Sequence, residues 1–143
     1  MIPTRQHCAS FVVIALLSVL MSACASTAPS DPAAPALAVA KSWQDALVAR
    51  DFGRALSLVA TDFTSPAWRT REDLRFYFEQ ARDRDYFEPA AAAPEPQKAT
   101  VTAEQVVIYP VGIRARAGVT VFRLTLALRD TEWKIVSADV EFY

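Results

Sequence analysis

The chain has 143 residues, enough for one domain of ordinary size and too few for two. Hydrophobic residues make up 52% of it and charged residues 22%, which excludes an intrinsically disordered chain and predicts a packed core. The formal net charge of -1 includes no basic excess, so the composition argues against nucleic acid as a partner.

Residues 1–23 are predicted to be a secretory signal peptide. Arg5 and His7 precede an apolar run from Phe11 to Met21 that one serine interrupts. The run is too short to cross a membrane, because a membrane-spanning helix needs about 20 apolar residues. A positively charged start followed by a short apolar stretch is typical of an export signal.

The end of this segment, Leu20-Met21-Ser22-Ala23-Cys24, resembles the bacterial lipobox. The resemblance implies cleavage between Ala23 and Cys24 and acylation of Cys24 by chains such as palmitate, which anchor the protein to a membrane. Ala25, and not an Asp, follows the cysteine, and in a Gram-negative cell the resemblance then implies export to the outer membrane. We therefore expect a place in the cell envelope, at the outer membrane facing the periplasm. The alternative is an ordinary signal peptide, cut at Ala23-Cys24-Ala25.

The mature chain is predicted to begin with a tether. Residues 24–36 comprise the lipidated cysteine and a stretch of alanine, serine and proline, a composition typical of a flexible linker. Cys8 and Cys24 are the two cysteines of the chain, and neither lies in the predicted domain, residues 37–143. The domain therefore has no disulfide to stabilise it.

Three helices are predicted in the first half of the domain. Apolar residues recur at three- and four-residue spacing over residues 37–47, and again over 52–63, where Asp51 is a suitable N-cap. Thr70 begins a capping-box pattern ahead of a third helix, over residues 71–84.

Strands are predicted in the second half. Residues 101–109 form the first strand, which Pro110 is expected to end. Residues 119–129 and 133–142 alternate between apolar and polar and are joined by a short turn, which indicates a hairpin. Helices followed by antiparallel strands predict an α+β fold.

The order and spacing of these segments resemble the nuclear transport factor 2-like superfamily, which includes ketosteroid isomerases, SnoaL-type polyketide cyclases, scytalone dehydratases and many non-enzymes. The resemblance implies a cone of about three N-terminal helices packed on a curved antiparallel sheet, spanning residues 37–143. The matching stretches are Trp43-Gln44-Asp45-Ala46-Leu47-Val48-Ala49-Arg50-Asp51-Phe52, Leu56-Ser57-Leu58-Val59-Ala60-Thr61-Asp62-Phe63, Arg71-Glu72-Asp73-Leu74-Arg75-Phe76-Tyr77 and Arg129-Asp130-Thr131-Glu132-Trp133-Lys134-Ile135-Val136.

The catalytic positions of the resembling enzymes are not matched. Ketosteroid isomerases carry a tyrosine about where Trp43 stands, an aspartate base where this chain reads Thr64-Ser65-Pro66-Ala67, and a protonated acid near Leu124. Scytalone dehydratases depend on histidine, and the single histidine here is His7, in the signal. We therefore assign no catalytic residue. The sequence also contains no glycine-rich phosphate loop and no metal-ligand cluster, so no cofactor and no metal are expected.

A small apolar ligand is expected in the open end of the cone, among Trp43, Phe63, Tyr77 and Leu124. Strict alternation along the last strand puts Asp139 on the same face as Ile135, where it would be a pocket acid. The other possibility is that this face meets solvent or a second copy of the chain.

Two functions from different classes follow. The first is a membrane-anchored lipoprotein whose domain binds a ligand or a protein without catalysis, with a homodimer through the sheet as one form of partnership. The second is a lipid-anchored isomerase, cyclase or dehydratase that uses an acid such as Asp139.

Overall fold

The computed structural model describes the following stretches: residues 31–87, 98–102, 104–116 and 118–142. The predicted signal peptide, its cleavage site after Ala23 and the lipidation site Cys24 lie outside these stretches. Asp31–Tyr143 forms one compact unit. Within the described stretches, none of the helices combines the length and hydrophobicity needed to traverse a lipid bilayer.

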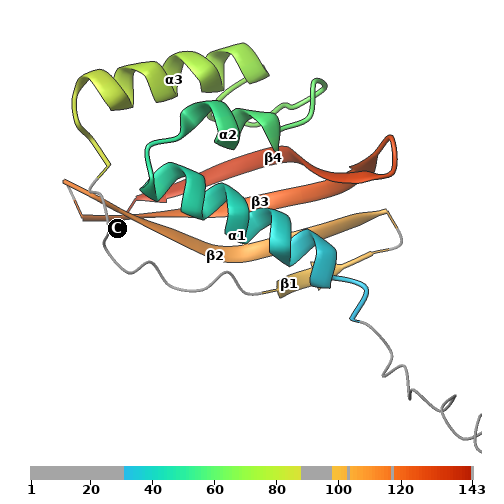
Figure 1. Cartoon of the computed structure of the whole chain (residues 1–143). Helices are drawn as coiled ribbons and strands as arrows, with labels where there is room; N and C mark the ends of the chain where they lie inside the picture. The colour runs from blue at the N-terminus through green and yellow to red at the C-terminus, as the bar shows by residue number, and fades with distance from the viewer. Residues whose placement is uncertain (1–30, 88–97, 103, 117, 143) are drawn as a thin grey trace, which may run out of the picture. The chain divides into compact units, whose positions relative to one another are not determined.

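The unit has two layers, with three helices on one face of a four-stranded sheet (Figure 1). The strands are antiparallel throughout and follow the order β1-β2-β3-β4, so each strand pairs with its neighbour in the chain. This arrangement confirms the predicted α+β class. The elements are α1 (Ala34–Val48), α2 (Phe52–Ser57), α3 (Arg71–Asp83), β1 (Lys98–Val101), β2 (Gln105–Ala115), β3 (Gly118–Arg129) and β4 (Glu132–Phe142).

Helix α1 begins three residues before the predicted start at Leu37, within the segment assigned to the tether. Its first turn contains Pro35, a residue compatible with that position because the first helical N–H groups have no intrahelical partner. Ala33 and Ala36 are fully buried. The last residues of the predicted tether therefore belong to the helix and its core contacts.

Helix α2 is shorter than predicted, since it ends at Ser57 and not at Phe63. The chain that follows runs along the edge of β4. Ala60 N–H donates to the Ile135 carbonyl (2.9 Å), and Thr64 N–H donates to the Val136 carbonyl (3.0 Å). The apolar spacing that suggested a longer helix comes from residues that are buried against this edge, among them Phe63.

The first predicted strand is two strands. A turn that begins at Thr102, whose N–H donates to the Gln105 carbonyl (2.8 Å), separates β1 from β2. Strand β2 continues through Pro110, which was expected to end it. The Tyr109–Pro110 peptide bond is cis, and the pairing with β3 shifts register there. A proline lacks the N–H that a sheet ladder requires, and this irregularity accommodates it.

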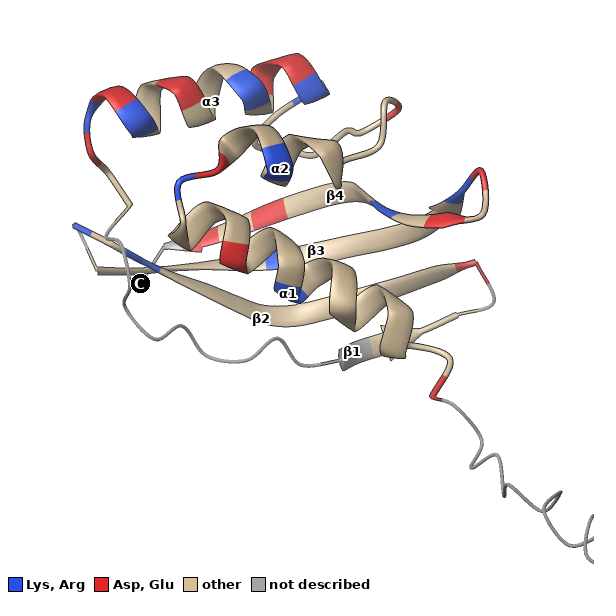
Figure 2. Cartoon of the chain, in the orientation of Figure 1, with Lys and Arg blue, Asp and Glu red and all other residues tan. Residues whose placement is uncertain are grey.

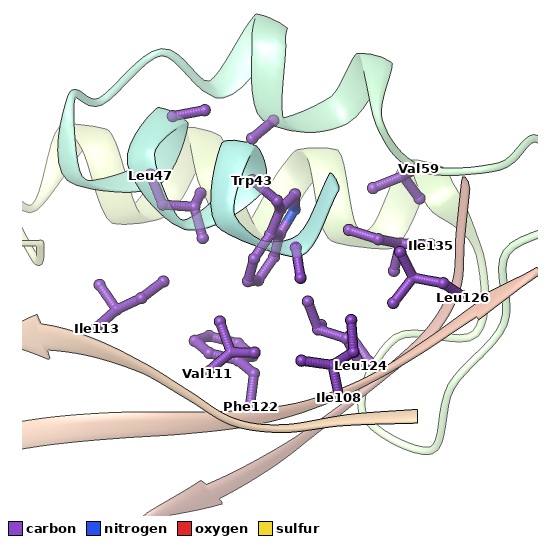
Figure 3. Packing of buried hydrophobic residues seen from close by; sticks show 14 of the residues in the cluster. Trp43, Leu47, Val59, Ile108, Val111, Ile113, Phe122, Leu124, Leu126 and Ile135 are labelled. Carbon is purple, nitrogen blue, oxygen red and sulfur yellow. The ribbon is translucent and has the colours of Figure 1, made fainter. Parts of the chain in front are cut away.

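The core lies between the helices and the sheet (Figure 3). The Trp43 side chain extends from α1 toward the sheet and packs against Phe122 of β3, with the two rings edge to face and their centroids 5.1 Å apart. Ile108, Leu124 and Ile135 come from three neighbouring strands and are fully buried beside them. Hydrophobic burial of this kind is the main stabilising contribution in a domain without a disulfide.

Candidate functional site

The five candidate pocket residues do not share one cavity. Trp43 and Leu124 are fully buried, and Phe63 is 3% exposed, so these three are part of the packed core. Tyr77 lines a surface pocket described below. Asp139 lies on the opposite face of the sheet. The structure therefore brings together the core members of the set and separates the acid from them.

The indole of Trp43 is an unusual core group. Its Nε1 is buried and has no hydrogen-bond partner in the described part of the chain. A buried donor without a partner costs about 1–3 kcal/mol, because its hydrogen bonds to water are lost and not replaced. The ring is held by packing against Phe78 and Phe122, at centroid distances of 6.3 and 5.1 Å.

The placement of Asp139 corrects the prediction that it shares a face with Ile135. Ile135 and Ala138 are both fully buried under the helices although they lie three residues apart in β4. The pairing of β3 and β4 contains a register shift that inserts an extra residue between them. Asp139 consequently pairs with Arg123 on the face away from the helices. A shift of one residue exchanges the faces of a strand, so alternation alone gave the wrong side.

That outer face carries a small polar cluster. The Tyr109 hydroxyl donates to Glu141 Oε2 (2.8 Å), and the Arg123 guanidinium lies 4.3 Å from the centre of the Tyr109 ring. Arg123 Nη2 is 3.6 Å from Glu141 Oε1. Asp139 Oδ1 is buried and makes no hydrogen bond within the described residues. The cluster leaves Asp139 as a candidate contact for a group from outside the chain.

A pocket of about 240 Å³ lies at the C-terminal end of α3. Its lining residues are Tyr77, Gln80, Ala81, Arg84 and Tyr86. The first four recur at the three- and four-residue spacing that puts side chains on one face of a helix. The pocket is therefore built by one helical face and by the residue that returns to it after the helix has ended.

The end of α3 explains how Tyr86 reaches this face. Asp85 has a left-handed backbone (φ 52°), which reverses the chain. The Tyr86 N–H then donates to the Ala81 carbonyl (2.8 Å), and the Asp85 N–H donates to the Arg82 carbonyl (3.0 Å). This pair of bonds is the Schellman motif, which satisfies the last carbonyls of a helix. It holds Tyr86 against the last turn of α3.

Two ion pairs fasten the same turn to the rest of the domain. Asp85 pairs with Arg50, at the end of α1, and accepts a hydrogen bond from Arg116 Nη2 (2.8 Å), just after β2. Arg50 also donates to the Phe87 carbonyl (2.8 Å). The side chain of Asp85 is about half exposed, so these pairs contribute little to the free energy of folding, and their main effect is to hold the turn in place.

The Tyr77 wall of the pocket is a phenol that stays neutral near pH 7. Burial raises the pKa of Tyr77 to about 12, and the nearby Tyr86 adds to the effect. Trp68 packs against Tyr77 with a ring-centroid separation of 4.9 Å. Arg84 is the charged residue among the described lining residues, and it forms no ion pair with any described residue. The site thus combines aromatic walls with one free guanidinium.

A larger hollow of about 530 Å³ lies beside the turn between β3 and β4. Charged residues gather at this turn (Figure 2). Asp62 accepts from Arg129 (2.8 Å) and Glu132 pairs with Lys134 (2.8 Å), and these donors lower the pKa of both carboxyls. Four of the six charged residues among its described lining form these two exposed ion pairs, and that lining has no aromatic ring, which makes the hollow a weaker candidate for an apolar ligand than the Tyr77 pocket.

Sequence reasoning identified Tyr77 and missed its pocket partners. The run from Arg82 to Asp85 alternates in charge and resembles a solvated helix end. The signal that Arg84 is different is its spacing of seven residues from Tyr77, which puts both on one face. The return of Tyr86 depends on the backbone of Asp85, and a non-glycine residue in the left-handed region is difficult to anticipate from sequence.

Comparisons with known proteins identify the fold. No protein-family model matches the chain, and no curated protein matches its sequence. An uncharacterized protein with a cystatin-like fold from Caulobacter vibrioides is similar in structure, with a TM-score of 0.61 at 11% identity, over 76% of this chain and 87% of that one. A ketosteroid isomerase-like protein from Erwinia carotovora atroseptica has a TM-score of 0.60 at 12% identity, over 78% of this chain and 95% of that one. The chain has the nuclear transport factor 2-like fold.

The predicted nuclear transport factor 2-like architecture is thereby confirmed as a fold. Bd1075 from Bdellovibrio bacteriovorus is similar over 72% of this chain, with a TM-score of 0.57 at 12% identity, and this chain spans 38% of its length. At such identities the likeness carries the fold alone, because this architecture hosts many functions. The function must be argued from the site.

Proposed function

We propose that this chain is a lipid-anchored protein of the cell envelope whose nuclear transport factor 2-like domain binds a small, largely apolar ligand without catalysing a reaction. The observation that carries the proposal is the pocket at Tyr77. It has aromatic walls, and no carboxylate is among its described lining residues. The acid considered for catalysis, Asp139, is on the other face of the sheet. An isomerase, cyclase or dehydratase that uses Asp139 therefore has no support from this geometry.

The membrane anchor is proposed from the lipobox-like segment that ends in Cys24. Metabolic labelling with an alkyne analogue of palmitate tests it directly. The wild-type chain and the control Cys8→Ser should incorporate the label and stay with the membrane fraction. Cys24→Ser should not incorporate it. Label that persists in Cys24→Ser would contradict acylation at this residue.

The outer-membrane location is proposed from Ala25, the residue after the acylated cysteine. Separation of inner and outer membranes on a density gradient tests it. The wild-type chain should move with the outer membrane, and Ala25→Asp should move with the inner one. Wild-type protein in the inner-membrane fraction would contradict the proposed location.

Ligand binding is tested by native mass spectrometry of the full chain purified from membranes in a non-ionic detergent. A mass above that of the lipidated chain, reduced in Tyr77→Leu and kept in the exposed control Phe76→Leu, supports a ligand at this pocket. Phe76 lies beside Tyr77 in α3 and is 61% exposed. A ligand mass that Tyr77→Leu leaves unchanged would assign the binding to another place.

The same spectrum reports a homodimer, which we propose forms through the sheet face opposite the helices. Val107, Thr125 and Ser137 form one row across the middle of that face, and each is half-buried. Short side chains in such a row allow a second sheet to approach closely. A dimer that becomes a monomer in Thr125→Arg supports the proposal, and a wild-type monomer contradicts it.

A further inference from the structure

We infer that the pocket at the end of α3 takes a small molecule with one aromatic ring and one carboxylate. The inference rests on the proposed binding function and names the chemical class of its ligand. It follows from three features of the pocket: an arginine without a partner, two aromatic walls that are already positioned, and a volume suited to a single ring.

The arginine is the first feature. Three arginines near this end of the domain have carboxylate partners, since Arg82 pairs with Asp83, and Arg50 and Arg116 pair with Asp85. Arg84 forms no ion pair and no side-chain hydrogen bond with any described residue, although it lines the pocket. A guanidinium presents a planar set of donors that matches a carboxylate with two parallel hydrogen bonds. The group that would pair with Arg84 in this pocket is therefore a negatively charged one.

The aromatic walls are the second feature. Tyr77 packs on Trp68 at 4.9 Å and on Phe87 at 6.4 Å between ring centroids, and Tyr86 packs on Phe87 at 5.4 Å. Each wall ring is thus packed against another ring of the domain before any ligand binds. Rigid walls reduce the ordering cost of binding, and phenol rings favour stacked or edge-to-face contact with another ring.

The polar atoms of these walls are available as well. The hydroxyls of Tyr77 and Tyr86 have no hydrogen-bond partner in the described part of the chain, and the amide of Gln80 lines the same pocket. Because burial keeps the Tyr77 pKa near 12, its hydroxyl is a neutral donor at pH 7. A carboxylate held by Arg84 can accept a further hydrogen bond from such a phenol.

The volume is the third feature. Pockets for drug-sized ligands occupy about 300–1,000 Å³. The pocket here, at about 240 Å³, is smaller than that range. It suits a single ring with a short acidic arm. An inorganic anion would use the arginine but leave the aromatic walls unused, and a neutral ring would leave the arginine unpaired.

The test uses the full chain in non-ionic detergent and three probes: phenylacetate, its neutral analogue phenylacetamide, and acetate. Binding is measured by isothermal titration calorimetry, with protein-free micelles as the blank. We expect phenylacetate to bind at least tenfold more tightly than phenylacetamide and acetate not to bind measurably. The preference for phenylacetate should weaken as salt is added.

Two matched variants locate the effect. Arg84→Gln should reduce phenylacetate affinity to that of phenylacetamide. Arg82→Gln should change neither affinity, because Arg82 is two residues away, exposed and paired with Asp83. Circular dichroism checks that both variants are folded. Equal binding of the two aromatic probes, or unchanged binding by Arg84→Gln, would overturn the inference.

The failure of the inference can be separated from failure of the proposed function. If neither aromatic probe binds but the native mass carries a ligand that Tyr77→Leu removes, the ligand class is wrong and the binding function stands. If neither probe binds and the native mass is that of the lipidated chain alone, both the inference and the proposed ligand-binding function are wrong.

Discussion

Replacing Trp43 by phenylalanine should destabilise the domain unusually little for a change at the centre of its core. Trp43 is fully buried, and its Nε1 has no hydrogen-bond partner among the described residues. The substitution removes roughly 50 Å² of buried apolar surface, which at about 25 cal/mol per Å² costs about 1 kcal/mol. The space left behind costs about 1 kcal/mol more.

Loss of the unpaired donor acts in the opposite direction. Because the N–H no longer has to be buried without a partner, about 1–3 kcal/mol is recovered. The net change expected for Trp43→Phe therefore lies between a loss of about 1 kcal/mol and a gain of about 1 kcal/mol in the free energy of unfolding. Trp43→Ala should lose about 3–5 kcal/mol, as large truncations in cores do.

Urea unfolding followed by far-ultraviolet circular dichroism measures these differences, since a tryptophan substitution alters the fluorescence signal. Phe122→Leu is the matched control: Phe122 is fully buried, contacts Trp43 and has no polar side-chain atom. It should cost more than Trp43→Phe. A loss above about 3 kcal/mol for Trp43→Phe would refute the reasoning, because it would mean that the indole N–H contributes a hydrogen bond.

Three further predictions concern the ends of the helices and the faces of the sheet. Tyr77 has a pKa of about 12 in the folded domain against 10.0 for a free phenol, so its contribution to stability is complete below pH 10 and is lost as the pH rises toward 12. The difference between near-ultraviolet titrations of the wild type and of Tyr77→Phe should show one phenol that ionises near pH 12, and ionisation near pH 10 would contradict its burial. Asp85→Ala should lower the free energy of unfolding by about 1–2 kcal/mol, because alanine disfavours the left-handed backbone there, and Asp85→Asn should lower it less; equal losses in thermal unfolding would exclude the backbone as the cause. Asp139→Asn should leave ligand affinity at the Tyr77 pocket unchanged in calorimetry, because the pocket lies on α3 and Asp139 lies on the face of the sheet away from the helices. A loss of affinity above about threefold would contradict this separation.

The long elements of this domain could be predicted because their periodicity is local. Helix α3 has a Thr70 capping box, in which the Asp73 N–H donates to Thr70 Oγ1 (3.1 Å) and the Thr70 N–H donates to Asp73 Oδ2 (3.0 Å). Strand β3 buries alternate residues such as Phe122, Leu124 and Leu126. Such patterns repeat within a few residues, so neighbouring side chains suffice to reveal them.

The ends of elements and the faces of irregular strands could not be predicted in this way. Helix α2 ends where the backbone of the following residues finds partners on β4, and these partners lie more than 70 residues later in the chain. The side of the sheet on which Asp139 lies depends on one extra residue in β4, which is visible only through the pairing with β3. Register is a property of two strands together, and a single strand does not contain it.

The candidate site also combines features that local spacing determines with features that depend on contacts between distant segments. The sequence alone determined that Tyr77 and Arg84 share a helical face, because helical spacing requires it. Only the tertiary structure decided that this face borders a pocket. The left-handed turn at Asp85 returns Tyr86 to the helix, and ion pairs with Arg50 and Arg116 hold that turn against α1 and β2. Local spacing determines which side chains are neighbours on an element, whereas contacts between distant segments determine what those side chains enclose.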